Sequence, residues 1–360
     1  MAGASTRGAD RMTRDELLDH IRHGVQVRTA DCRGWDMSGL DLSGAMLDHV
    51  DFSGARFTGA NLEGSVLTHC RLDGGDLSRS TLDNAQFFSC RLPQATLDGA
   101  RCEGTRFSES TLPQTSFLEA HVDNALFFRC ELTQSRLRSD HFKQVSFTEC
   151  RLEGIDFSGS TLHSVTFHRQ DLTTAVFAGA SFDTTLFIEC DLTKQRFPAQ
   201  RFLRCVFTDS RMDHVDFGNA ALVQCIFKGA SLRQANFAQA DAPNALFPAA
   251  DLRGATLQRG RFDRAIWVEA LLEGADLSEA HIHESVFHRA RCKGASFRGA
   301  SLHDADFSYA ELVDADLRDA QFLRTRVHRT VEDGARFSRR KGLIESDPEL
   351  HKAQTWSKVQ

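Results

Sequence analysis

The residue types best suited to chemistry in this sequence are ten cysteines and fifteen histidines. Thiolates bind soft metals and act as nucleophiles, and imidazoles bind transition metals. No C-x-x-C occurs, and the numbers of all ten cysteines end in 0, 2 or 5. Such regular spacing predicts thiols that pack in an apolar interior and stay inert. A disulfide between neighbours twenty residues apart, such as Cys130 and Cys150, is the alternative.

Several histidines form pairs with the same spacing of twenty, and the members of each pair should stack on the surface. The pairs are His49 with His69, His121 with His141, and His283 with His303. Two stacked imidazoles could hold a metal ion, but this spacing fixes no third ligand. The sequence therefore favours solvated pairs, and it predicts no metal site, no cofactor and no catalytic residue.

A repeat of five residues must position all these side chains. Every fifth residue from Met37 to Val327 is apolar, and the residue two places before it is small, mostly alanine between Ala220 and Ala320. Neither a helix nor a strand keeps a period of five on one face. A second period of twenty runs through phenylalanines from residue 87 to residue 247. It predicts four repeats in each turn of a coil.

Proline and glycine mark the corners of that coil. Prolines such as Pro93 and Pro198 directly follow a large apolar residue, and glycines such as Gly44 and Gly254 stand two places after one. This order is the preference of a type II turn. The large apolar residues then point inward, and the predicted core includes Phe227, Leu232, Phe237, Leu252, Phe307, Leu312 and Leu317.

Repeats such as ADLRG (250–254), ADFSY (305–309) and ANLEG (60–64) resemble the pentapeptide-repeat family. The resemblance covers about Cys32 to Phe337. It implies an all-β solenoid, a right-handed quadrilateral β-helix of about 15 coils at the strand spacing of about 4.8 Å. We therefore divide the sequence into an N-terminal segment (1–30), a pentapeptide-repeat β-helix (31–337) and a polar C-terminal tail (338–360).

Both ends carry signals for short capping helices. Residues 13–16 read TRDE, which is a capping box, and Gly24 is placed to end a helix over about residues 13–23. In the tail, Asp347 and Pro348 suit the start of a second short helix. Such helices would cover the open ends of the apolar core.

The net charge of −6 arises from 43 basic and 49 acidic residues, so no strong field attracts nucleic acid or membrane. Direct nucleic-acid binding is not expected. The opening residues hold no apolar signal region, and no run of eighteen apolar residues occurs, so a cytoplasmic location is expected. A convex solenoid lacks a cleft that could shift pKa values, and no enzyme activity is expected.

Two irregular stretches are the candidate partner-binding surfaces. In the first, the small inward positions hold Asp140, Ile155, Gln170, Gln195 and Gln200, which should widen or bend the coils and leave polar groups needing partners. The candidates there are Lys194, Gln195, Arg196, Gln200 and Arg201. The second stretch, residues 324–341, is rich in arginine and has two acids. Its candidates are Arg324, Arg326, Arg329, Arg339 and Arg340, with charges that protect an open sheet edge as the alternative interpretation.

These features predict a non-enzymatic rigid scaffold that binds another protein through its outer surface or its ends, and they leave open whether it pairs as a homodimer. The opening, TRDELLDHIRHG leading into CRGWDMSGLDLSGAML, is similar to pentapeptide-repeat proteins that accompany bacterial type VI secretion components. That resemblance implies an accessory or loading factor for spike and effector proteins.

Some members of the family resemble a DNA duplex in charge and shape, which gives an alternative function. Such a protein would bind and protect a type II topoisomerase (gyrase), and it needs a continuous acidic stripe. Outward columns of this sequence, such as Asp36, Arg56 and Asp76, alternate in charge instead. Opposite charges stacked in this way attract modestly and cancel each other's distant field.

Overall fold

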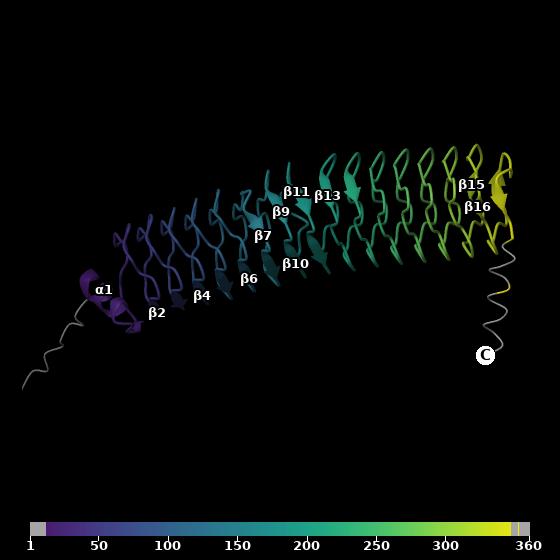
Figure 1. Cartoon of the computed structure of the whole chain (residues 1–360). Coiled ribbons are helices and arrows are strands. Elements are labelled where there is room, and N and C mark those ends of the chain that lie inside the picture. The colour runs from purple at the N-terminus through teal and green to yellow at the C-terminus, as the bar shows by residue number, and fades with distance from the viewer. Residues whose placement is uncertain (1–11, 347–351, 353–360) are drawn as a thin grey trace, which may run out of the picture. The chain divides into compact units, whose positions relative to one another are not determined.

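The computed structural model describes residues 12–346 and residue 352. These residues form an all-β solenoid of about 16 turns with a single helix (Figure 1). The chain divides into two compact units, the first made of Met1–Thr166 and Thr174–Gly179 and the second of Phe167–Thr173 and Ala180–Gln360. Residues 347–351 and 353–360, where the sequence predicts a C-terminal helix, lie outside the described residues.

Four parallel ladders, one on each side of the coil, hold successive turns together. At the start of the first unit, the partners are Asp31 with Asp51, Asp36 with Arg56, Asp41 with Asn61, and Met46 with Val66. Each pair joins residues twenty positions apart, so the period of twenty is the length of one turn. The quadrilateral β-helix expected from the repeats is confirmed.

Where a side of the coil stays extended for two or three residues, it forms a strand. In the first unit, β1 to β6 pair in chain order, β6 pairs with β8, and β7 pairs with β9. Their bounds are β1 (Val27–Arg28), β2 (Met46–Asp48), β3 (Val66–Thr68), β4 (Gln86–Phe88), β5 (Arg106–Ser108), β6 (Leu126–Phe128), β7 (Phe142–Lys143), β8 (Ser146–Thr148) and β9 (Thr161–His163). Strand β10 (Thr166–His168) lies where the two units adjoin in the sequence.

The second unit relies more on isolated bridges than on strands. Strand β13 pairs with β11 and β14, β15 pairs with β17, and β16 pairs with β18. The bounds are β11 (Ser181–Asp183), β12 (Leu186–Ile188), β13 (Arg201–Leu203), β14 (Ala221–Val223), β15 (Asp316–Leu317), β16 (Thr325–Arg326), β17 (Arg336–Phe337) and β18 (Leu343–Ile344). Strand β18 lies within the segment that the sequence analysis assigns to the polar tail.

The apolar interior follows the period of five. From Met37 to Leu317, every fifth residue is at most 3 % exposed, and the seven predicted core residues are at 0 or 1 %. Phenylalanines one turn apart stack, and the ring centroid of Phe227 lies 4.9 Å from that of Phe207 and 4.8 Å from that of Phe247. Burying one such side chain stabilises the fold by about 1.5–3 kcal/mol, so this column is a main source of stability.

The corners use the left-handed backbone region. Positive φ recurs at residues whose numbers end in 4 or 9, as at Gly54 (67°) and Gln94 (58°), which is the type II geometry predicted from Pro93. A residue with a side chain costs about 1–2 kcal/mol in this region. Its amide N–H offsets part of that cost by bonding to the next turn, since Gln94 N donates to the carbonyl O of Pro113 at 2.9 Å.

Cysteine or serine replaces alanine at most of the corners that follow the three-residue strands. The Sγ of Cys90, after β4, donates to the carbonyl O of Leu67 at 3.3 Å, and the Oγ of Ser110, after β5, donates to that of Phe87 at 3.2 Å. At a tight corner, the corresponding carbonyl accepts a backbone amide instead. These thiols and hydroxyls therefore satisfy a carbonyl one turn earlier, which is a structural role beyond packing.

Helix α1 (Arg14–Arg22) packs against β1 at the start of the first unit. The predicted capping box is present, because Glu16 N donates to Thr13 Oγ1 at 3.3 Å and Thr13 N donates to Glu16 Oε2 at 2.7 Å. The helix buries Leu17 and Ile21. Among the described residues, no helix has the length and apolar character needed to cross a bilayer.

One irregular corner differs from the sequence analysis. Asp140 does not occupy the inward position, because it is exposed and Ser139 is buried in its place. The Oγ of Ser139 donates to the carbonyl O of Ala120 at 2.8 Å and accepts from His141 N at 3.0 Å. The inward polar group thus finds its partners locally, and the regular pattern resumes at Phe142.

Candidate functional site

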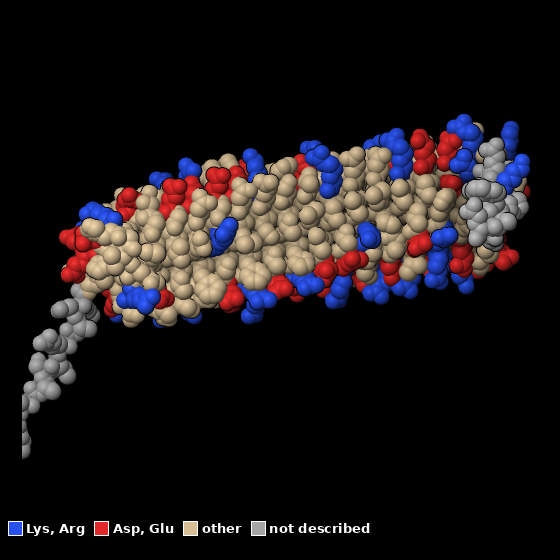
Figure 2. Space-filling view, turned by 60° about the horizontal axis from the view of Figure 1, so that its bottom comes forward, with Lys and Arg blue, Asp and Glu red and all other residues tan. Residues whose placement is uncertain are grey.

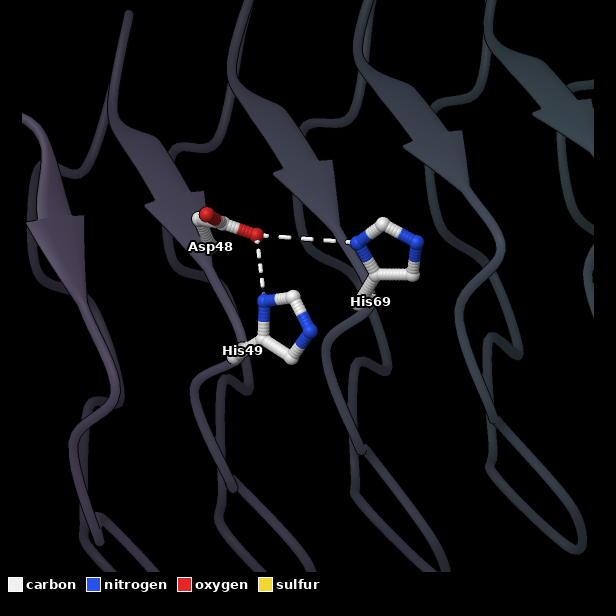
Figure 3. A group of neighbouring side chains, drawn as sticks. All are labelled: Asp48, His49 and His69. Carbon is white, nitrogen blue, oxygen red and sulfur yellow. Dashed lines mark hydrogen bonds and ion pairs between the residues drawn. The ribbon is translucent and has the colours of Figure 1, made fainter.

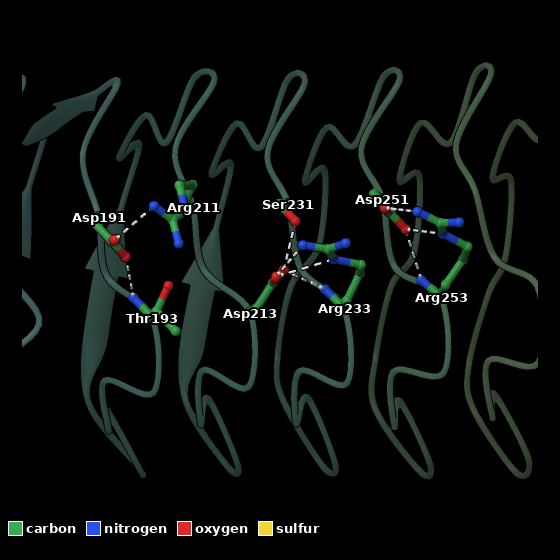
Figure 4. Close-up of polar contacts among 8 residues, drawn as sticks. All are labelled: Asp191, Thr193, Arg211, Asp213, Ser231, Arg233, Asp251 and Arg253. Carbon is green, nitrogen blue, oxygen red and sulfur yellow. Dashed lines mark hydrogen bonds and ion pairs between the residues drawn. The ribbon is translucent and has the colours of Figure 1, made fainter.

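One side of the second unit carries a column of opposite charges, which we call the charged ladder (Figure 4). Its arginines bond to carboxylates of the same or the preceding turn: Arg211 Nη1 lies 3.3 Å from Asp191 Oδ2, and Arg233 Nε donates to Asp213 Oδ2 at 3.0 Å. The ladder consists of Asp191, Arg211, Asp213, Arg233, Asp251, Arg253 and Glu273.

The carboxylates of the charged ladder are held by several donors each. Asp213 Oδ1 accepts from Ser231 Oγ at 2.5 Å and from Arg233 N at 3.1 Å. Burial alone would raise the pKa of Asp213, but the hydrogen bonds from Arg233 and Ser231 hold this pKa below its usual value. The group is therefore ionised at neutral pH and already paired, which leaves it unsuited to act as a proton acceptor in catalysis.

A shallow hollow of about 640 Å³ follows the charged ladder. Its lining consists of Asp213, His214, Arg233, Gln234, Arg253, Gly254 and Glu273. Arg253 also makes a bidentate pair with Asp251, at 2.6 and 2.8 Å. The carboxylates along this side are paired with arginines of the protein itself, so the hollow offers little unpaired charge to a ligand.

A different side of the same turns carries only aliphatic residues at the outward position of its ladder. We call this set the aliphatic column, and consecutive members pair in register one turn apart. The inward neighbour of each member, such as Phe227 beside Ile226, is buried in the core. The aliphatic column consists of Leu186, Val206, Ile226, Leu246, Ile266 and Val286.

The aliphatic column stays in contact with solvent. Ile266 is 36 % exposed and the other five members are half-buried. Pro248 and Val268, which follow the column on the same side, are half-buried as well. In Figure 2, which brings the lower margin of Figure 1 forward, charged side chains line the margins, and mostly uncharged residues form a band between them.

The other three sides of these turns are mostly polar at the corresponding positions, with Ala221 and Leu271 as exceptions. In the turn that contains Ile226, they hold Ser231, Asn236 and Asp241, each in its own ladder. A continuous apolar strip bordered by polar residues is typical of a protein-binding surface. The sequence analysis missed this strip, although reading every twentieth residue from Leu186 gives L, V, I, L, I and V.

The candidate residues around Lys194 are split between surface and interior roles. Lys194 and Arg201 are exposed, and Arg196 Nε lies 3.7 Å from Asp216 Oδ2. Gln195 is turned partly inward, and its Nε2 donates to the carbonyl O of Leu172 at 2.6 Å. Gln200 is half-buried. A partner contact at this set stays a prediction.

The arginine-rich stretch is largely neutralised by acids of earlier turns. Arg324 makes a bidentate pair with Asp304, at 2.6 and 2.7 Å, and Arg326 Nη1 lies 3.7 Å from Asp306 Oδ2. Arg340 pairs with nearby acids, 2.9 Å from Glu332 and 2.9 Å from Glu345. The side chains of Arg329 and Arg339 are exposed. Counting charges within the stretch alone overstated its positive field.

The cysteines and histidines take the places that their spacing predicts. All ten cysteines are buried and free, and burial raises the pKa of Cys32 and Cys190 to about 12, so these thiols carry no thiolate at neutral pH. The three histidine pairs stack, with centroid distances of 4.5 Å (His49 and His69), 3.8 Å (His121 and His141) and 5.0 Å (His283 and His303).

Two family models match this chain. One, described as a pentapeptide repeat region, matches residues 106–177 and 180–257. The other, described as pentapeptide repeats (8 copies), matches residues 29–64, 60–99 and 285–322. Together they cover more than half of the chain. The chain belongs to the pentapeptide-repeat family.

Solved structures similar to this pentapeptide-repeat protein include three described relatives. A pentapeptide repeat protein from the thylakoid lumen of Arabidopsis thaliana is 27% identical, covering 30% of this chain and 72% of its own, with a TM-score of 0.26. HetL of Nostoc sp., a protein involved in heterocyst differentiation regulation, is 19% identical and has a TM-score of 0.21. The match covers 88% of this chain and 97% of HetL. QnrB1, a plasmid-mediated fluoroquinolone resistance protein, is 16% identical and has a TM-score of 0.23. The match covers 76% of this chain and 98% of QnrB1. A search of curated proteins finds no match.

Proposed function

We propose that this pentapeptide-repeat protein is a non-enzymatic scaffold that binds another protein through the aliphatic column of its second unit. The observation that carries this proposal is the run from Leu186 to Val286, in which six successive turns each carry an aliphatic residue at the outward position of one side. These side chains are half-buried or, for Ile266, exposed. A partner with an apolar strip would remove their accessible surface from water, at about 25 cal/mol per Å² buried.

The ladder also fixes the spacing and direction of the binding residues. Because Val206, Ile226 and Leu246 are consecutive partners in one parallel ladder, their side chains repeat at about 4.8 Å along the solenoid. A surface ordered before binding costs little entropy when the partner arrives. A rigid scaffold of this kind gains its specificity from the sequence of the column and of the residues beside it.

A purely structural role for the column is the competing explanation. Aliphatic neighbours across a ladder stabilise a sheet by about 0.2–1 kcal/mol per pair without any partner. The two explanations differ in what contacts the outer surface of the column, and a site-specific cross-link can decide between them.

The test compares two sides of one turn. A photoreactive phenylalanine analogue replaces Ile226 in one variant and Asn236 in another. These two residues lie ten positions apart, which places them on opposite sides of the coil. After illumination in an extract of the source cells, we expect a discrete adduct from position 226 and a weaker one or none from position 236. Equal labelling from both positions, or no adduct from position 226, contradicts the proposal.

The arginines of the two predicted surfaces are proposed as additional contacts for the same partner. Arg201 and Arg339 are exposed, so Arg201→Glu and Arg339→Glu would change surface charge without disturbing the core. We expect each to weaken the cross-link at position 226 if the partner is acidic at its edges. An unchanged adduct in both variants removes these residues from the proposed surface.

A secretion setting is the specific form of this proposal that the opening segment suggests. The partner would then be a spike or effector protein of bacterial type VI secretion, and this chain its accessory or loading factor. The family-model matches begin at residue 29, so this setting depends on the resemblance of the opening segment. Co-purification of the chain with spike or effector proteins encoded beside its gene tests it, and neighbouring genes without any link to secretion would count against it.

The DNA-mimicking alternative makes a different prediction. It requires a continuous acidic face, whereas Asp213 and Asp251 are each paired with an arginine in the charged ladder. A supercoiling assay with purified gyrase measures the interaction directly. We expect no inhibition and no protection from a gyrase poison, and a clear effect in this assay would favour the alternative.

A further inference from the structure

Asp48, His49 and His69 lie together on the surface of the first unit (Figure 3). His49 Nδ1 lies 2.7 Å from Asp48 Oδ1, and His69 Nδ1 lies 3.6 Å from the same oxygen. The side chain of Asp48 is 25 % exposed, and those of the histidines are 59 % and 46 % exposed. Two imidazole nitrogens thus face one carboxylate oxygen from two successive turns.

The backbone holds the three side chains in this arrangement. Asp48 is the last residue of β2, His49 is the corner residue that follows it (φ 56°), and His69 is the same corner one turn later (φ 52°). The histidine rings stack with centroids 4.5 Å apart, and the ring of Phe88 meets that of His69 edge-on at 6.1 Å. His69 is therefore packed between two rings.

The carboxylate of Asp48 interacts with the two histidines rather than with the nearby arginine. Arg28 pairs with Asp48 in the ladder one turn earlier, but its guanidinium donates to Gln26 Oε1 at 2.9 and 3.1 Å. The Oδ1 of Asp48 instead faces the two histidine rings.

We propose that Asp48, His49 and His69 bind a divalent first-row transition metal ion such as Zn²⁺, through Asp48 Oδ1 and the two Nδ1 atoms. Two imidazoles and one carboxylate are a ligand set that zinc accepts, with the fourth position open to water or to a group from a partner. Ligands about 2.0–2.1 Å from a tetrahedral Zn²⁺ lie about 3.3 Å apart. The observed spacings of 2.7 and 3.6 Å lie on either side of this value.

The grouping distinguishes this histidine pair from the others. In the part of the chain that the structure describes, Asp48, His49 and His69 are the one set of three ligating residues whose atoms all lie within 4.8 Å of one another. His121 and His141 stack more closely, at 3.8 Å, but without a third ligand in such a set. This second pair is a matched control for the proposed site.

The test measures Zn²⁺ binding to the full-length chain, with any purification tag removed, by titration calorimetry. His49→Asn and His69→Asn suit the corners because asparagine tolerates the left-handed region, and Asp48→Asn removes only the charged oxygen ligand. We expect one site in the wild type and binding at least about 10-fold weaker in each variant, since even second-shell losses cost 10- to 100-fold. The double variant His121→Asn/His141→Asn should bind as the wild type does.

Three outcomes would overturn the proposal: unchanged affinity in Asp48→Asn or in either histidine variant, an equal loss in the control variant, or equal binding of Mg²⁺, which prefers oxygen ligands alone. Co²⁺ gives a second measurement that needs no variant. We expect its spectrum to lack the sulfur-to-metal charge-transfer band that thiolates produce. The appearance of that band would assign the metal to a cysteine instead.

Discussion

The charged ladder and the aliphatic column lie on two sides of the same turns, and they share one backbone geometry and one register. The charged ladder satisfies itself, because Asp213 and Asp251 bond to Arg233 and Arg253 within the protein. Members of the aliphatic column pair with one another along the ladder, Val286 at its end also pairs with Asp306, and the outer surface of the column remains in contact with solvent. The comparison teaches that a side with matched charges has little left to offer a partner, whereas the aliphatic side does.

The energies behind the two sides differ in kind. Exposed ion pairs contribute about 0–1 kcal/mol each and weaken as salt rises. Apolar surface gains about 25 cal/mol per Å² only when it is removed from water. The charged ladder should therefore contribute modestly to stability in the free protein, and most of the aliphatic column's contribution should appear on binding.

The largest expected effect comes from a substitution in the core that lies beneath both sides. Phe227→Asp places a charge at a position that is 0 % exposed, and it should destabilise the fold by more than about 4 kcal/mol. Ile226→Asp, one residue earlier and outward, is the control and should keep a cooperative melting transition. Similar melting temperatures for the two variants would show that the assignment of inward and outward positions is wrong.

The next effect concerns the aliphatic column itself. The triple variant Val206→Thr/Ile226→Thr/Leu246→Thr removes apolar surface, and threonine is still a residue that suits a β-ladder. We expect fluorescence of a hydrophobic dye such as ANS to fall by roughly half, and the free energy of unfolding to change by about 1–3 kcal/mol in total. A large loss of stability with unchanged dye fluorescence would instead assign the column a purely structural role.

A smaller effect is expected from the charged ladder. Asp213→Asn removes the negative charge beside Arg233 but keeps the shape of the side chain. The cost should be about 1 kcal/mol or less, and it should shrink in 1 M NaCl, where the Debye length is about 3 Å. Denaturant titrations at low and high salt measure both values. The loss of unfolding free energy in the aliphatic triple variant should be the same in high salt. If it also shrinks in high salt, the two sides do not differ in the kind of energy they contribute.

The last effect is a pH dependence on a third side. The hydrogen bonds and charge of Arg318 lower the pKa of Asp316 to about 2. Because the folded pKa lies below the unfolded value of about 3.9, this carboxylate stabilises the fold above about pH 4, and its contribution disappears as the pH falls through about 2. Denaturation midpoints of the wild type and Asp316→Asn should differ at pH 5 and converge near pH 2. A difference that is independent of pH would contradict this.

The fold could be predicted from the sequence because its determinants are local and repeated. The inward position of Leu232 follows from its phase alone, and Pro93 marks a corner directly after the inward Leu92 in the same phase. Ser139 could not be predicted, because its inward turn depends on hydrogen bonds to Ala120 and His141 rather than on the phase.

The candidate sites were harder to predict because they depend on which outward residues meet. Arg324 and Asp304 stand twenty residues apart, and the same rule that pairs Asp36 with Arg56 could have found them. The third ligand beside His69 is different, because Asp48 is twenty-one positions away and its approach depends on side-chain direction at a corner. The aliphatic column could be found by reading every twentieth outward residue for apolar character. In the sequence analysis, the outward columns were considered only for their charge.

The corner at Ser139 also bears on how such chains can evolve. A deviation there is repaired within a single side of the coil, so that Phe142 returns to the interior and the residues after it keep their places. Substitutions that reshape a single bend in this way would then leave the rest of the coil intact, whereas a substitution at an inward phenylalanine would not.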